Sequence, residues 1–148
     1  MSDDILSIIP SDPEYVPVVA AQQMALALFS SFVGKADEVN MSVTDEVQFV
    51  DAGENFESVT CPACGADLNG WWQGAVETAF ANQFADLTVQ VPCCGAQGSL
   101  NDLVYNWPAG FARFRLTARN PVKDVDDGQV AMLSSILKSD VRKVWSRY

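Results

Sequence analysis

Hydrophobic positions recur every three or four residues in three segments of the chain, and this spacing predicts three helices. The first predicted helix begins between residues 12 and 17 and ends at Gly34. It is apolar nearly all round, which is typical of a helix that is buried on several sides. The second covers residues 70–84. The third opens at Asp126, and its hydrophobic stripe continues to Val144.

Alternation of hydrophobic and polar residues predicts strands between these helices. Residues 38–43 and 47–49 share one period of alternation, which fits either a hairpin or one bent strand. Short strands are expected at residues 56–60 and 87–91, and a longer strand with one basic face at residues 112–119. The mixture predicts an α+β fold: an antiparallel sheet carries two cysteine-containing turns and packs against an N-terminal, a middle and a C-terminal helix.

The composition of the 148 residues is that of a folded protein, since 49% are hydrophobic and 19% are charged. We therefore expect a single domain over residues 1–148. The formal net charge is −10, and it is distributed unevenly. Residues 1–112 contain 15 acidic residues and one base, Lys35, whereas residues 113–148 contain eight basic and four acidic residues.

This acidic charge excludes some partners and favours others. Affinity for nucleic acid comes largely from basic side chains, so the chain is expected to bind no nucleic acid. The same field attracts basic proteins and accelerates their association. Acidity that serves only to keep the protein soluble is the alternative interpretation.

The N-terminal segment has no recognisable targeting signal. Asp3 and Asp4 make it acidic, whereas a secretory signal begins with positive charge. The hydrophobic run at residues 18–29 is interrupted by Gln22 and Gln23, and it is shorter than the ~20 residues that a membrane span requires. We therefore expect a cytoplasmic protein without membrane contact, in a compartment where thiols stay reduced.

The cysteines form two tight clusters, and the chain contains no histidine. The first cluster is Cys61-x-x-Cys64, and the second is the adjacent pair Cys93 and Cys94; a glycine follows each. A Cys-x-x-Cys-Gly turn lets both thiolates point at one ion. The spacing predicts a structural zinc ion held by four thiolates, and such a closed tetrahedral site leaves no position open for catalysis.

The first cluster resembles one knuckle of a zinc ribbon, a fold in which two β-hairpins each offer a Cys-x-x-Cys-Gly turn. The resemblance covers about residues 59–97, and the ribbon-like part is expected at about residues 56–97. The second cluster departs from the family pattern. When Cys94 is aligned with Cys64, Val91 stands where a cysteine is expected, so Cys93 would have to be the fourth ligand. The whole chain also resembles small bacterial proteins with one such cysteine pattern, which implies no activity.

Other uses of the cysteines remain open. They can be unmetallated buried or reactive thiols, a disulfide pair, or the centre of a thiol-redox or metal-handling protein. The absence of histidine removes Ser-His and Cys-His catalytic pairs and histidine-ligated catalytic zinc. There is no glycine-rich phosphate loop either. We therefore expect that the protein is not an enzyme, and a small enzyme built on a carboxylate site is the last-ranked alternative.

The first functional hypothesis is a non-enzymatic acidic protein that binds a basic protein partner. Immunity-type proteins, which neutralise nuclease toxins by filling a basic cleft with carboxylates, are one form of this hypothesis. The expected contact residues are acidic, and they are expected to cluster on a hairpin that the first cysteine turn stiffens: Asp45, Glu46, Asp51, Glu54 and Glu57.

Overall fold

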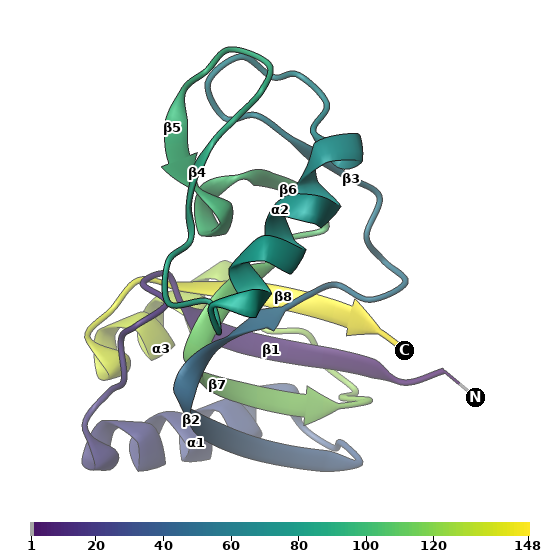
Figure 1. Ribbon diagram of the computed structural model, residues 1–148. Helices are drawn as coiled ribbons and strands as arrows, with labels where there is room; N and C mark the ends of the chain where they lie inside the picture. The colour runs from purple at the N-terminus through teal and green to yellow at the C-terminus, as the bar shows by residue number, and fades with distance from the viewer. Residues whose placement is uncertain (1) are drawn as a thin grey trace.

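The computed structural model describes residues 2–148, and its largest part is a four-stranded antiparallel sheet with helices on one face (Figure 1). The strands lie in the order β2-β7-β1-β8. The first helix, α1, connects β1 to β2, and the last helix, α3, connects β7 to β8. In each case the two connected strands are parallel and one strand lies between them, which is the split β-α-β arrangement of ferredoxin-like folds. The α+β class predicted from the sequence is confirmed. In chain order, the elements of this part are β1 (Asp4–Pro10), α1 (Val19–Val33), β2 (Glu38–Val50), β7 (Gly110–Arg119), α3 (Asp127–Leu137) and β8 (Val141–Arg147).

The core of this part lies between the sheet and its helices. Strands β1 and β7 turn alternate side chains toward the helices, among them Leu6 and Leu116, which are fully buried. Phe29 of α1 and Leu133 of α3 fill the space from the other side. Burying one side chain of this size contributes about 1.5–3 kcal/mol. The cluster is therefore a large source of stability for the sheet.

Helix α1 buries one stripe and leaves the rest of its surface to solvent. Val19 and Met24 are 63% and 60% exposed. The expectation that this helix is buried on several sides is wrong, because a helix in an outer layer meets the sheet on one side only. Among residues 2–148, no helix has both the length and the hydrophobicity to cross a membrane. The buried residues of α1 are spaced three or four positions apart: Gln22, Ala25, Phe29 and Val33.

The C-terminal segment also differs from the prediction. Helix α3 ends at Leu137 rather than continuing to Val144, and Lys138 takes the left-handed conformation (φ 57°) that closes the helix. Residues 141–147 form strand β8, which pairs with β1 along its whole length. Val141 and Val144 fit a helical stripe by their spacing, but the long-range pairing with β1 decides the conformation.

Strand β1 was not predicted, because both of its faces are covered. Ile8 faces the helices, whereas Ile9 packs on the opposite face against Val50 and Val144. A strand that is buried on two faces has no alternation of hydrophobic and polar residues. Residues 5–9 therefore give no half-buried pattern, although they form a central strand of the sheet.

Residues 51–109 form an insertion between β2 and β7, and it rises from one end of the sheet (Figure 1). Before it, β2 is one bent strand, whose pairing with β7 shifts between Val43 and Gln48. Both cysteine turns lie in the insertion, next to two short ladders, β3-β6 and β4-β5, rather than on the large sheet. The middle helix predicted at residues 70–84 is confirmed as α2, although it ends at Ala81 because Gln83 and Phe84 take left-handed conformations. The elements of the insertion are β3 (Ser58–Thr60), α2 (Asn69–Ala81), β4 (Thr88–Gln90), β5 (Gln97–Ser99), the 3₁₀ helix η1 (Leu100–Asp102) and β6 (Val104–Asn106).

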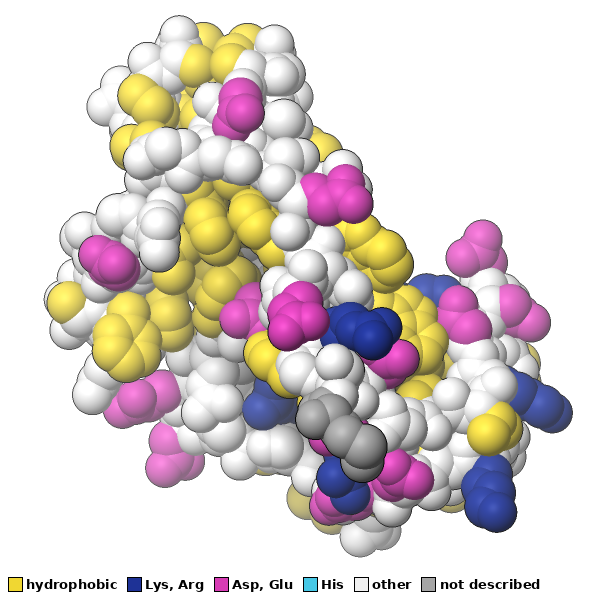
Figure 2. Space-filling model, turned by 90° about the vertical axis from the view of Figure 1, so that its right-hand side faces the viewer, with side chains coloured by type: hydrophobic (Ala, Val, Ile, Leu, Met, Phe, Trp, Pro, Cys, Tyr) yellow, Lys and Arg dark blue, Asp and Glu magenta, His cyan; other side chains and the backbone are white. Residues whose placement is uncertain are grey.

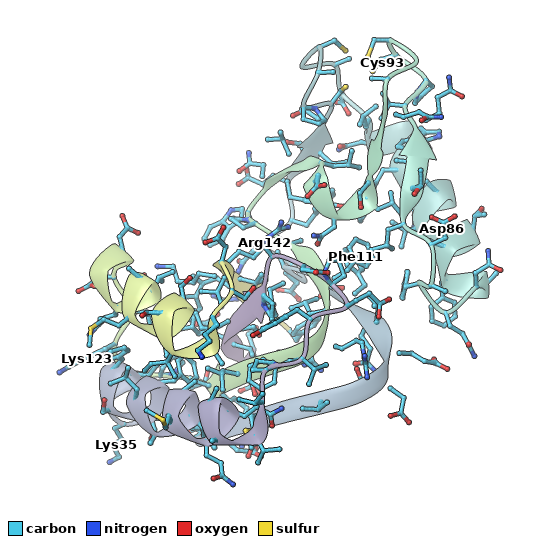
Figure 3. The ribbon with its side chains drawn as sticks, turned by 90° about the vertical axis from the view of Figure 1, so that its left-hand side faces the viewer. Lys35, Asp86, Cys93, Phe111, Lys123 and Arg142 are labelled. Carbon is cyan, nitrogen blue, oxygen red and sulfur yellow. The ribbon has the colours of Figure 1, made fainter. Side chains whose placement is uncertain are left out.

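Arg142 of β8 ties the insertion to the sheet, and Figure 3 shows it with Phe111 at the junction. Its Nη1 donates hydrogen bonds to the carbonyl oxygens of Asn101 (2.7 Å) and Ala109 (3.1 Å). Asn101 in turn donates to the Ser11 carbonyl (2.7 Å) and accepts from the Phe111 N–H (2.9 Å). Hydrogen bonds to a charged group are the stronger ones, so this network anchors the insertion against β1 and β7.

Candidate metal centre

The first cysteine turn is closed by two backbone hydrogen bonds. The Cys61 N–H donates to the Ala66 carbonyl (2.9 Å), and the Gly65 N–H donates to the Cys61 carbonyl (2.8 Å). Gly65 has a φ of 78°, a conformation that favours glycine. The turn therefore folds back tightly enough to place the side chains of Cys61 and Cys64 on one side.

The second turn repeats this geometry with different residues. The Val91 N–H donates to the Ala96 carbonyl (3.0 Å), the Gly95 N–H donates to the Val91 carbonyl (3.0 Å), and Gly95 has a φ of 73°. Val91 therefore occupies the position of Cys61, as the sequence alignment of the two turns predicts. By the same register, Cys94 corresponds to Cys64.

The four sulfur atoms converge at the tip of the insertion (Figure 3). The Sγ atoms of Cys61 and Cys94 are 3.8 Å apart, and those of Cys64 and Cys93 are 3.3 Å apart. All four Sγ atoms lie within 4.8 Å of one another. A tetrahedral ion with metal–sulfur bonds of about 2.3 Å places its ligands roughly 3.8 Å apart. The four cysteines could therefore hold a metal ion.

The electrostatic environment differs among these thiols. Backbone N–H groups of Cys64 and then Ala63 lower the pKa of the Cys61 thiol to about 7, although its burial opposes the shift. The hydrogen bond with the sulfur of Cys64, together with partial loss of hydration, raises the pKa of the Cys93 thiol to about 12. Without a cation, the cluster therefore favours a state with one ionised thiol over a state with several. A bound cation would allow the other thiols to ionise, because coordination deprotonates a thiol.

The base of the two turns rests on an aromatic cluster. Trp72 of α2 stacks on Phe56 at 5.0 Å between ring centroids, and its Nε1 donates to the Tyr105 hydroxyl (3.2 Å). Tyr105 donates onward to the Leu100 carbonyl (2.6 Å). Val59, which precedes the first turn by two residues, is fully buried in the same cluster. These contacts orient the peptide segments from which the cysteines project.

The five acidic residues proposed for partner binding are divided between two places. Asp45 and Glu46 lie in β2, in the segment where its register shifts. The other three lie in the loop after β2, where Asp51 accepts a hydrogen bond from the Tyr148 hydroxyl and Glu57 accepts one from the Asn106 amide (3.0 Å). Asp51 also has a raised pKa because it is partly buried.

The expected hairpin for these acidic residues is wrong. β2 pairs with β7, and β3 pairs with β6, so the segment between β2 and β3 is a connection rather than a turn between partners. The bent form of β2 carries the chain across to the end of β8, where Gly53 bridges Arg147. The role of these acidic residues in partner binding stays a prediction.

Some residues that shape the site carry no simple sequence signal. Asn101 and Arg142 connect the insertion to the sheet across long sequence separations. Asn69 is easier to find, since a polar residue at a helix start commonly satisfies backbone groups; its side-chain oxygen accepts from the Val59 N–H (2.8 Å).

The comparisons with known proteins add no relative to this description. A scan against protein-family models found no match, and searches of the curated proteins and of the solved structures found none either. The function must therefore be argued from the site and the surface of this chain.

Proposed function

We propose that the protein is a non-enzymatic binding protein, in which a structural zinc ion stabilises an acidic insertion that engages a basic protein partner. The observation that carries the metal site is the convergence of four Sγ atoms on one point. Thiolates are the ligands that structural zinc prefers, and four of them complete its tetrahedral coordination. No coordination position remains for a substrate, so the ion serves the fold.

The charge of the insertion supports the second half of the proposal. Residues 51–109 contain seven acidic residues and no lysine, arginine or histidine. Zinc bound by four thiolates adds a net charge of about −2, from the charges of the ion and its ligands. A surface of one sign attracts partners of the other sign and raises their association rate. An immunity-type protein that occupies the basic cleft of a toxin is one specific form of this function.

The metal site is tested first on protein purified without added metal. We expect one zinc per chain by elemental mass spectrometry, with all four thiols slow to react with a thiol reagent. An absence of metal together with four reactive thiols would overturn the proposal. Ala63→Ser is the matched control, because it changes an exposed position of the first turn that carries no thiol.

The register of the two turns allows a sharper version of this test. Cys93→Ala is expected to lower zinc affinity by more than the roughly 10–100-fold that the loss of an outer-shell partner of a ligand costs, because it removes a ligand. Adding Val91→Cys to that variant should restore most of the affinity, because Val91 occupies the position of Cys61 in the second turn. Competition with a chromophoric chelator measures both values. Equal affinity in the wild type and Cys93→Ala would remove Cys93 from the ligand set.

The second candidate is a thiol-redox or metal-handling protein, and one observation favours it. Three of the four cysteines are exposed, namely Cys64, Cys93 and Cys94. Reactive cysteines are accessible and sit where a thiolate is stabilised. Rapid exchange of zinc with a chelator, without loss of folded structure, would favour this function over a structural site. Slow exchange that follows the unfolding of the insertion would favour the first.

A further inference from the structure

A groove lies between β2 and the C-terminal half of α2, with a volume of about 800 Å³. On the face drawn in Figure 2, hydrophobic side chains line a hollow between the insertion and the sheet, and acidic side chains lie around it. Val47 and Phe49 form the wall of the groove on β2, and Val76 and Phe80 form the wall on α2. Phe84, in the turn after α2, also lines the groove. The volume of the groove is that of a site for a small molecule or a short peptide.

The aromatic floor of the groove is held in place by a chain of ring contacts. Phe84 lies 5.2 Å from Phe111, which itself stacks on Phe49 at 4.8 Å. Phe80 meets Phe84 edge to face at 5.6 Å, yet 68% of its surface is exposed. An exposed phenylalanine above a rigid aromatic floor is the arrangement of an anchor contact in a protein interface.

The backbone after α2 is unusual at this point. Gln83 and Phe84 both take left-handed conformations, with φ of 58° and 56°. This region is unfavourable for a bulky residue, and such strain concentrates at functional sites. The turn is held by hydrogen bonds from the Gln83 N–H to the Phe80 carbonyl (2.8 Å) and from the Phe84 N–H to the Ala79 carbonyl (2.9 Å). It returns the chain so that Phe84 lies beneath Phe80.

The charge around the groove has one sign. Glu46 on β2 and Glu77 on α2 line it, and no basic residue does. Residues 36–112 contain no lysine, arginine or histidine at all. A ligand that fills the groove with a hydrophobic side chain would therefore also need basic residues of its own to complement these carboxylates.

Strand β2 offers a further means of recognition. In the sheet of residues 2–148 it is an edge strand, paired with β7 on one side. Edge strands present unpaired backbone groups to a segment of another chain, and side chains in adjacent pockets then give specificity. The groove runs along Glu46–Phe49, beside the register shift of this strand.

We propose that this groove binds an extended segment of a basic protein. A hydrophobic side chain of that segment packs against the rings of Phe80 and Phe84, and lysine or arginine residues beside it pair with Glu46 and Glu77. The inference rests on the proposed function for the basic character of the partner, and it adds the place and the form of the contact. Of the five acidic residues predicted to contact a partner, Glu46 lies in this groove. Asp51, Glu54 and Glu57, in the loop after β2, do not line it.

A random dodecapeptide library displayed on phage, selected against the full zinc-loaded chain, tests the proposal. Enriched peptides are synthesised, and their affinity is measured by fluorescence anisotropy. We expect sequences with a hydrophobic residue flanked by lysine or arginine. Phe80→Ser is expected to weaken their binding about tenfold or more, and Glu46→Lys with Glu77→Lys by a similar factor.

Matched controls change exposed residues that do not line the groove. Met24→Ser removes an exposed hydrophobic side chain from α1, and Glu14→Lys with Asp140→Lys makes the same change of net charge outside the groove. Both should leave the affinity within about twofold. Circular dichroism and thermal unfolding, measured for every variant, establish that the chain is folded.

The possible failures are distinguishable. Basic peptides that bind Phe80→Ser and Glu46→Lys/Glu77→Lys as tightly as the wild type would overturn the groove while leaving the basic partner class intact. Enriched peptides without lysine or arginine would overturn both the groove proposal and the proposed partner class. Enrichment no stronger on the wild type than on a chain with all three groove substitutions would also overturn the groove.

Discussion

The sheet with its two helices and the insertion are stabilised in different ways. The sheet part buries long side chains between two layers, and Leu6, Phe29 and Leu133 have no exposed surface. The strands of the insertion are three residues long, and α2 has one buried residue, Ala79. The insertion has a hydrophobic cluster of its own, but most of its buried side chains, such as Leu68, Phe84 and Val91, lie in the turns between these short elements. Irregular segments depend on such contacts to offset the entropy of folding. The insertion is the region in which a metal ion would matter most.

The two regions differ in charge as strongly as in packing. The insertion holds seven acidic residues and no basic ones, whereas the remaining 12 acidic and all nine basic residues lie outside it. Outside the insertion, ion pairs balance part of the charge, such as Lys143 with Asp124 at 3.1 Å. We infer that the sheet serves as a scaffold and that the recognition surface lies where α2 of the insertion meets the edge strand β2.

Removal of the metal should give the largest difference between the two regions, because only the insertion is expected to depend on it. With a strong chelator, amide protons at residues 58–106 are expected to lose protection from hydrogen exchange, while those at residues 112–119 and 141–147 keep it. The zinc-binding free energy in small zinc-binding peptides is about 10–16 kcal/mol, and it is largely folding free energy. Added zinc should restore the protection. Unchanged protection in metal-free protein would mean that the aromatic cluster around Trp72 suffices.

A substitution that creates a cavity in the core of the sheet part tests whether this region is stabilised by hydrophobic packing and not by zinc. Phe29→Ala is expected to lower the free energy of unfolding by about 3–5 kcal/mol, because it removes a fully buried ring. Urea denaturation should give the same loss with and without zinc. Met24→Ala, on the exposed side of the same helix, should change it by less than about 0.5 kcal/mol. A loss that depends strongly on zinc would show that the two regions unfold together.

The junction between the regions is expected to contribute less. Arg142→Ala removes the guanidinium from the carbonyls of Asn101 and Ala109, and hydrogen bonds to a charged group are worth about 1.5–3 kcal/mol. We expect thermal unfolding, followed by circular dichroism, to separate into two steps. Lys123→Ala removes an exposed positive charge near α1 and serves as the control. One transition with an unchanged midpoint would argue against this coupling.

The features that local sequence predicts are those that local interactions build. The two cysteine turns are closed by hydrogen bonds within six residues, so their glycines suffice to align Val91 with Cys61. The path of the C-terminal segment was predicted wrongly, because the pairing of β8 with β1 joins opposite ends of the chain. The groove between β2 and α2 was not foreseen for the same reason. Among the residues that line it, only Glu46 was one of the predicted contact residues.

The smallest expected effect concerns Asp51, at the boundary between the two regions. Burial raises the pKa of this carboxyl above its ordinary value, against hydrogen bonds from backbone N–H groups. The folded chain therefore holds this proton more tightly than the unfolded chain does. The stability that protonation gives is present at acidic pH and is lost as the pH rises from about 4 through the folded-state pKa.

Asp51→Asn should accordingly raise the midpoint of thermal unfolding at pH 7, by about 1–2 °C, because solvent screens a partly exposed carboxylate. The side-chain oxygen that accepts from the Tyr148 hydroxyl is kept in this variant. The gain should disappear at pH 3, where the wild-type carboxyl is protonated as well. Glu14→Gln, at an exposed position before α1, is the matched control. A loss of stability at pH 7 would mean that the charge of Asp51 is favourable at this boundary, and that the acidic loop is anchored by it.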